Sequence, residues 1–223
     1  MKKISIFLVC VILLAFGTSG LVSAQAFHMP MNMFSVGGGA LIDWSFRNGI
    51  TDGIDYIGYN TTNFGGFAFF DATYAVLDLY LARGSVTQTV PDNRSRTRVE
   101  TGGNIMQFGF SLLGKYPIGM QQGFTIFPLL GIGYNRVLSG KNWRGEEIVS
   151  PGNYSQFGII FGGGLDYNIN PLLFLRAEAL FNIRFSSKAM RDEATAYKIL
   201  DNVNVDTTLG LGPRIKVGVG YRL

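Results

Sequence analysis

Apolar and polar residues alternate along most of this chain. Eight segments carry the two-residue period, and they cover residues 33–46, 63–70, 74–85, 105–116, 124–135, 156–167, 172–185 and 207–223. Such alternation is typical of β-strands whose two faces meet different environments. The pattern therefore predicts eight β-strands.

The last segment shows the alternation most clearly. One face carries only apolar side chains, those of Ile215, Val217, Val219, Tyr221 and Leu223. The other face carries cations and glycines, namely Arg214, Lys216, Gly218, Gly220 and Arg222. This combination suits a wall with lipid outside and a polar lumen inside.

Long and short connections between the segments alternate. The long ones are polar and cover residues 47–62, 86–104, 136–155 and 186–206, whereas the short ones cover residues 71–73, 117–123 and 168–171. This asymmetry is typical of outer-membrane barrels, with long loops outside and short turns in the periplasm. Lipid offers no partner to an open sheet edge, so the first and last strands should pair. We predict an all-β fold, a closed eight-stranded antiparallel up-and-down transmembrane β-barrel with both termini in the periplasm.

Two strands carry features that the alternation does not resolve. The phase of the segment 63–70 stays open, because Phe67, Phe69 and Phe70 occupy both faces. Pro128 interrupts the segment 124–135, and a proline within a strand predicts a local defect in the ladder.

Three tyrosines predict half of an aromatic girdle. Tyr116, Tyr167 and Tyr221 fall on apolar faces near the ends of their strands that lead to short connections or to the C-terminus. Aromatic residues gather at membrane interfaces, so we expect these three at one membrane depth.

The N-terminus resembles a secretory signal peptide. Lys2 and Lys3 precede an apolar stretch over residues 4–14. Both Val22-Ser23-Ala24 and Ala24-Gln25-Ala26 offer small residues at the spacing of a cleavage site. The interruption at residues 17–20 disfavours the alternative of a membrane anchor. We expect residues 1–24 to be a signal peptide, 25–32 a periplasmic N-terminal segment and 33–223 the barrel. Cleavage would remove Cys10, the only cysteine, and leave no disulfide in the mature chain.

Composition supports a membrane barrel rather than a nucleic-acid-binding protein. Without Lys2 and Lys3 the chain has 17 basic residues (19 − 2) against 15 acidic ones, too small an excess for nucleic acid. The full sequence holds 30 Gly, 18 Phe and 10 Tyr, and only 15% of its residues are charged. Beyond the signal no run reaches the ~18 apolar residues of a membrane helix.

Charged residues on the inward faces form the first candidate site. The phasing sends them into the lumen, where buried charges must be paired or solvated. We expect a lumen charge cluster of Asp43, Asp78, Arg176, Glu178, Arg184, Arg214 and Lys216, with Lys115, Asp166 and Arg222 also inward. Because the last two strands are neighbours, Glu178 should lie near Arg214 or Lys216. Two roles stay open: a salt-bridged plug, or a lined ion path or gate.

The long connections are the second candidate site. They carry basic and aromatic residues that could contact a host molecule or a lipopolysaccharide-like anion, namely Arg94, Arg96, Arg98, Trp143 and Arg144.

Catalytic chemistry has little support in the sequence. Enzymes built on small barrels use histidine with serine or a carboxylate, and the one histidine, His28, precedes the first strand. No His/Cys metal set and no phosphate-binding loop occurs. We expect no enzymatic activity, no cofactor and no metal.

The C-terminal residues Lys216, Gly218, Tyr221 and Leu223 resemble the sorting signal of bacterial outer-membrane barrels, although the usual last residue is Phe. The chain as a whole looks like the small eight-stranded barrels of the OmpA transmembrane, OmpX and OmpW type, and residues 66–74 resemble spirochaete members. The resemblance implies outer-membrane lipid and the barrel assembly machinery as partners.

For function, we expect a non-enzymatic outer-membrane protein that is structural, or adhesive through its surface loops. The alternative is a porin-like channel for small, mainly apolar solutes, which the OmpW resemblance implies.

Overall fold

The computed structural model describes residues 34–48, 58–90, 98–119, 123–141, 147–185 and 209–223. The expected signal peptide, the expected periplasmic segment and His28 lie outside the described residues.

The described chain is an antiparallel barrel. Its strands are β1 (Ser35–Asn48), β2 (Gly58–Asp71), β3 (Ala75–Val90), β4 (Arg98–Lys115), β5 (Ile118–Gly119), β6 (Phe124–Lys141), β7 (Gln156–Asn168), β8 (Leu173–Phe185) and β9 (Leu209–Arg222), with one 3-10 turn, η3 (Pro151–Tyr154).

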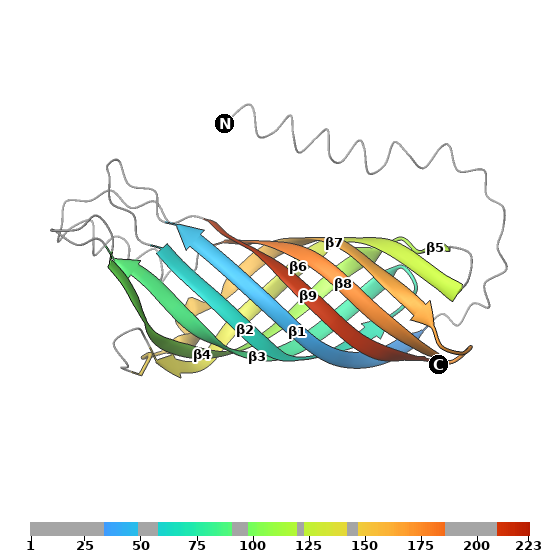
Figure 1. Ribbon diagram of the computed structural model, residues 1–223, viewed down its shortest axis with the longest axis horizontal. Coiled ribbons are helices and arrows are strands. Elements are labelled where there is room, and N and C mark those ends of the chain that lie inside the picture. The colour runs from blue at the N-terminus through green and yellow to red at the C-terminus, as the bar shows by residue number, and fades with distance from the viewer. Residues whose placement is uncertain (1–33, 49–57, 91–97, 120–122, 142–146, 186–208) are drawn as a thin grey trace, which may run out of the picture. The chain divides into compact units, whose positions relative to one another are not determined.

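Eight of these strands form the wall, in the sheet order β4-β3-β2-β1-β9-β8-β7-β6, and pairing of β4 with β6 closes it. The two-residue β5 pairs only with β6 in this description. Strands β1 and β9 lie side by side (Figure 1). The prediction of a closed eight-stranded barrel is confirmed.

Several strands are longer than the alternation predicted. Residues 58–62, 86–90, 98–104 and 136–141, assigned to loops, belong to β2, β3, β4 and β6. Arg98 therefore begins β4 and does not lie in a loop. These stretches carry polar residues on both faces, so their alternation fades, yet the backbone ladder continues independently of side-chain polarity.

The phase of β2, which the sequence left open, is set by register with β1 and β3. Asn63, Phe67 and Phe69 point inward and are buried, whereas Phe64 and Phe70 are exposed on the outer wall. In the other wall strands the predicted inward and outward faces are observed.

Pro128 lies where the β6 ladder changes partner. On one side of β6, the pairing with β4 ends where Lys115 lies opposite Leu129. The pairing with β5 begins where Ile118 lies opposite Ile126, so Pro128 falls in the gap between the two. Proline has no N–H to donate, so it fits this gap. The predicted ladder defect is confirmed, while the register with β7 continues unbroken.

Aromatic rings fill the lumen by packing onto inward glycines. A Cβ built on Gly109 would overlap the Tyr80 ring, and one built on Gly220 would overlap the Phe174 ring. Gly164 faces the Phe127 ring in the same way. Opposing a large ring with glycine lets a narrow barrel hold bulky side chains.

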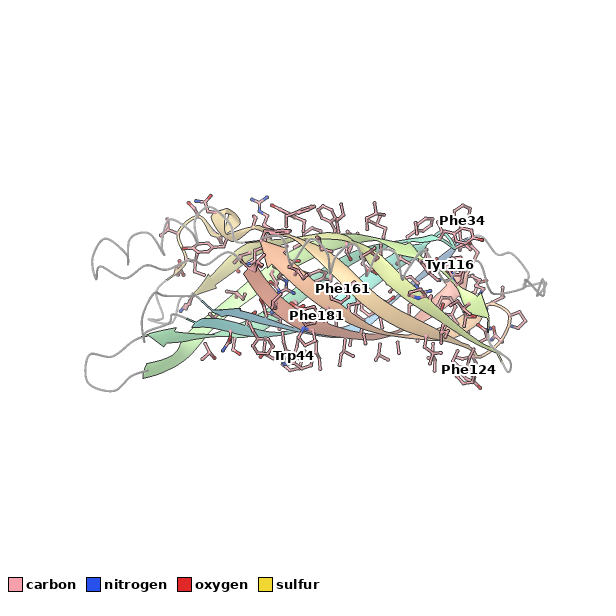
Figure 2. All side chains as sticks on the ribbon, turned by 90° about the horizontal axis from the view of Figure 1, so that it is seen from above. Phe34, Trp44, Tyr116, Phe124, Phe161 and Phe181 are labelled. Carbon is pink, nitrogen blue, oxygen red and sulfur yellow. The ribbon has the colours of Figure 1, made fainter. Side chains whose placement is uncertain are left out.

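The outer wall is apolar over most of its height. On β9 the outward residues from Leu209 to Tyr221 are apolar at every second position, and most are 43–57% exposed. Figure 2 shows labelled aromatic side chains on the outside of the strands, with Phe34, Tyr116 and Phe124 near one end of the barrel. None of the described segments is a helix long and apolar enough to span a bilayer.

Candidate functional site

The lumen holds a set of buried charges. Each of the seven residues predicted for the cluster points inward and is at most 4% exposed: Asp43, Asp78, Arg176, Glu178, Arg184, Arg214 and Lys216. Asp71, Lys115 and Asp166 join them through ion pairs. Among the described residues the network holds five acids and five cations. It is arranged in three levels, which we name by the residue at the centre of each.

The Arg176 level lies near the end with the short connections, since Asp71 and Lys115 are the last residues of β2 and β4. Arg176 Nε and Nη2 donate to the two oxygens of Asp166 at 2.8 Å each, and Nη2 lies 2.5 Å from Asp71 Oδ2. Lys115 Nζ lies 2.5 Å from Asp71 Oδ2 and 3.8 Å from Asp166 Oδ2. The Arg176 guanidinium also covers the Phe69 ring at 4.3 Å. This level is neutral, with two acids and two cations.

The Lys216 level follows toward the other end. Lys216 Nζ lies 2.6 Å from Asp78 Oδ2 and 2.5 Å from Glu178 Oε2. Ser111 Oγ donates to Asp78 at 3.1 Å. Neither Glu178 oxygen accepts a hydrogen bond of regular geometry, so its contact with Lys216 is ionic rather than aligned. Two acids share one cation, and the level carries a net charge of −1.

The Asp43 level lies near the end with the long connections, since Arg184 is next to the last residue of β8. Arg184 Nη2 lies 2.5 Å from Asp43 Oδ1, and Arg214 Nε donates to the same oxygen at 3.1 Å. Arg214 Nη2 also donates to the Tyr80 hydroxyl at 2.8 Å. Two cations share one acid, so this level carries +1 and balances the Lys216 level.

The structure assigns Glu178 one close cation rather than several. Arg184 and Arg214 pair with Asp43, and Arg176 Nε approaches Glu178 Oε1 only to 4.0 Å. The pairing of β8 with β9 puts Glu178 directly opposite Lys216. Hence Lys216, and not Glu178, is the shared centre of its level.

Sequence reasoning missed Asp71. It was placed in the turn 71–73, but it ends β2 and is 3% exposed between Lys115 and Arg176. Its parity with Asn63 and Phe69 would have indicated an inward position, had the phase of β2 been known.

The other candidate residues are placed only in part. Arg94, Arg96, Trp143 and Arg144 lie outside the described residues, and no side-chain position is described for Arg98. In the C-terminal motif, Lys216 and Gly218 face the lumen, whereas Tyr221 and Leu223 face outward.

The chemistry available in the lumen is that of ion pairs and packed rings. Among the residues that the structure describes, no group of three or more His, Cys, Asp or Glu could hold a metal ion.

Comparison with known proteins gives matches in structure but none in sequence. No family model matches the chain, and no curated protein matches it. The barrel is similar to Neisserial surface protein A (NspA), with TM-score 0.45 and 13% identity over 85% of this chain and 97% of that one. It is also similar to the outer membrane protein OprG from Pseudomonas aeruginosa, with TM-score 0.46 and 16% identity over 84% and 94%.

A third similar structure is Ail of Yersinia pestis in complex with the heparin analogue sucrose octasulfate, with TM-score 0.35 and 14% identity over 84% and 99%. These are barrels of the small outer-membrane kind that the sequence resembles. Similarity of this degree says nothing about function, and the resemblance to spirochaete members stays untested.

Proposed function

We propose that this chain is a non-enzymatic outer-membrane β-barrel whose lumen is closed to solutes and whose surface connections carry its structural or adhesive role. The observation that carries the proposal is the three-level charge network, because its ten members are at most intermediate in exposure and lie on both sides of the lumen. A charge removed from its partner inside a protein is costly, so the network holds the lumen shut.

The outer wall supports a membrane location. From Leu209 to Tyr221 the chain of β9 advances by twelve residue steps (221 − 209). At ~3.3 Å per residue and a tilt of ~40° this band is ~30 Å tall, close to the ~25 Å apolar band of outer-membrane barrels. In this proposal both termini lie in the periplasm, at the end with the short connections.

The alternative function, a channel for small apolar solutes, draws on the apolar residues inside the barrel. Leu41, Leu113, Leu129, Ile160 and Leu180 point inward, but each is at most 4% exposed within one cluster with the lumen aromatics. Close packing of these side chains favours space filling over a path for solutes.

Planar-bilayer recording of the refolded protein tests the closed lumen. We expect no stepwise conductance from the native chain. A Phe174→Ala/Arg176→Ala variant, which empties part of the Arg176 level, is the matched opened barrel and should conduct. Native steps as large as those of this variant would contradict the closed lumen and favour a channel.

Cell fractionation tests the location. Tyr221→Asp/Leu223→Asp places charges in the motif that resembles a sorting signal, and we expect the protein to be lost from the outer-membrane fraction. Leu209→Asp is the control, because Leu209 is equally outward on β9 and 44% exposed, like Tyr221, but lies outside the motif. Equal loss of the control would show that a charge on the lipid face, and not the motif, is responsible. Unchanged membrane amounts of the double variant would refute the proposed sorting role.

A further inference from the structure

The inward charges of the described residues are segregated by strand. The last two strands, β8 and β9, carry five cations and one acid: Arg176, Arg184, Arg214, Lys216 and Arg222 with Glu178. The first three strands carry one aspartate each, Asp43 on β1, Asp71 on β2 and Asp78 on β3, and no described inward cation. The inner face of β8–β9 is thus a cationic ribbon, and the inner face of β1–β3 is an acidic one.

The two ribbons meet inside the lumen, on the two sides of the seam between β1 and β9. Asp43 lies 2.5 Å from Arg184 and 3.1 Å from Arg214, both on the cationic ribbon. Each further aspartate also has a partner there, Asp71 with Arg176 at 2.5 Å and Asp78 with Lys216 at 2.6 Å. These four ion pairs join residues 105 to 171 positions apart in the chain. They link the two ends of the chain, which must meet for the barrel to close.

The closing seam has a problem of register that the other seams do not share. Every other pair of wall neighbours is consecutive in the chain, so a connection helps to set its register. Strands β1 and β9 have no connection between them. A slip of one residue would turn the apolar face inward, but a slip of two leaves all faces as they are. Alternation therefore cannot select between the native seam and a seam slipped by two.

The ion pairs can make that selection. In the native seam Asp43 lies opposite Arg214, and Leu41 lies opposite Lys216. A slip of two places Gly212 or Lys216 opposite Asp43. Either slip moves Lys216 away from Asp78 and leaves buried charges without partners.

We propose that the cationic ribbon of β8–β9 is a recognition surface whose partner is the acidic ribbon of β1–β3, and that the ion pairs between them select the register in which the barrel closes. The selection acts when the last strands reach the first ones. It does not depend on whether the lumen conducts, so the bilayer experiment and this inference can fail separately.

Disulfide trapping on the full chain in a Cys10→Ser background tests the register. Ala40→Cys with Val217→Cys reports the native seam, because these outward residues are directly paired. Ala40→Cys with Val219→Cys or Ile215→Cys reports a slip of two in either direction. With the native charges, we expect cross-linking at the native pair alone. Adding Asp43→Asn/Asp78→Asn should lower native cross-linking several-fold and produce a slipped pair.

Asp166→Asn is the matched control. Asp166 is also buried, at 5% exposed, but its partner Arg176 lies on the neighbouring strand β8, which a short connection joins to β7. This variant should keep the native cross-link even if the barrel becomes less stable. A slip of equal size in the control, or a native cross-link unchanged in Asp43→Asn/Asp78→Asn, would overturn the proposal.

A charge-swapped variant keeps the test decisive if the double asparagine variant does not fold. Glu178 lies directly opposite residue 216, so the exchange is made in a Glu178→Gln background that avoids two facing acids. There Asp78→Lys/Lys216→Asp exchanges the members of one seam pair, and we expect it to restore heat-modifiable barrel and the native cross-link relative to Asp78→Lys in the same background. If the swap recovers neither, pairing across the seam does not select the register and the inference is wrong.

Discussion

Lys216 and Glu178 form one ion pair, but their removal should have very different effects. Lys216 is the only cation within 4 Å of Asp78 among the described residues, and it holds Glu178 as well. Lys216→Met leaves Asp78 without a cation within 4 Å among the described residues, and leaves Glu178 with Arg176 alone, at 4.0 Å. Glu178→Gln leaves the Lys216–Asp78 pair intact and places a neutral amide of the same shape beside it.

The structure sets the magnitudes. Lys216, Asp78 and Glu178 are each 2% exposed, so water screens their interactions little. Breaking a buried pair from one side typically costs ~3–5 kcal/mol, and Lys216→Met should reach that range. Glu178→Gln removes the excess acid of the level and should cost less than ~1.5 kcal/mol, about the net value of one hydrogen bond. The difference between the two variants follows from geometry, because Lys216 contacts both acids whereas Glu178, among the described residues, forms an ion pair within 3 Å with Lys216 alone.

Denaturant unfolding of the refolded barrel in one detergent, followed by the heat-modifiable band, measures both variants. Lys216→Met/Glu178→Gln serves as the repair, because it neutralises one of the two carboxylates that Lys216 held and should recover part of the loss. Equal losses for the two single variants, or a double variant no better than Lys216→Met, would refute the reasoning that Lys216 is the shared centre.

Two further predictions concern packing and topology. Gly220→Val should lower the free energy of unfolding by ~1–3 kcal/mol, because the new side chain would overlap the Phe174 ring. The outward Gly66→Ala is the control and should change this free energy little, because its Cβ would meet only Gly39 O at 3.6 Å. A protease added to intact cells should cut within residues 91–97 and not within 117–123, as mass spectrometry of the fragments would show; cleavage that needs rupture of the outer membrane would contradict the orientation.

The sequence predicted the barrel because its two-residue period has a single physical cause in seven of the eight strands. Lipid outside and charge inside leave only one phase possible for strands such as β8 and β9. In β2 the lumen is filled by the rings of Phe67 and Phe69, which look like lipid-facing residues in the sequence. The alternation therefore did not show which face of β2 points inward, and so the inward position of Asp71 could not be predicted.

The membership of the lumen cluster could be predicted, but its pairing could not. Inward parity places Asp43 and Arg214 in the lumen from the sequence alone. Which acid meets which cation depends on register and on side-chain reach across the barrel, and these are set only when the wall has closed. The neighbouring strands therefore suggested Arg214 or Lys216 as the partner of Glu178; the structure pairs Glu178 with Lys216, and it pairs Arg214 with Asp43.

The arrangement of charge explains why a barrel this narrow can tolerate so many ions. The Lys216 level carries −1 and the Asp43 level +1, so neither is compensated by itself, and each is compensated by the other. Arg176 Nε, 4.0 Å from Glu178 Oε1, connects the neutral level to this pair. Because charges are balanced between levels along the barrel axis as well as within each level, removing a charge from one level should also change the electrostatic energy of the next. Combined substitutions at Asp43 and Lys216 should consequently be less destabilising than the sum of the two single changes, by an amount that a double-mutant cycle measures directly.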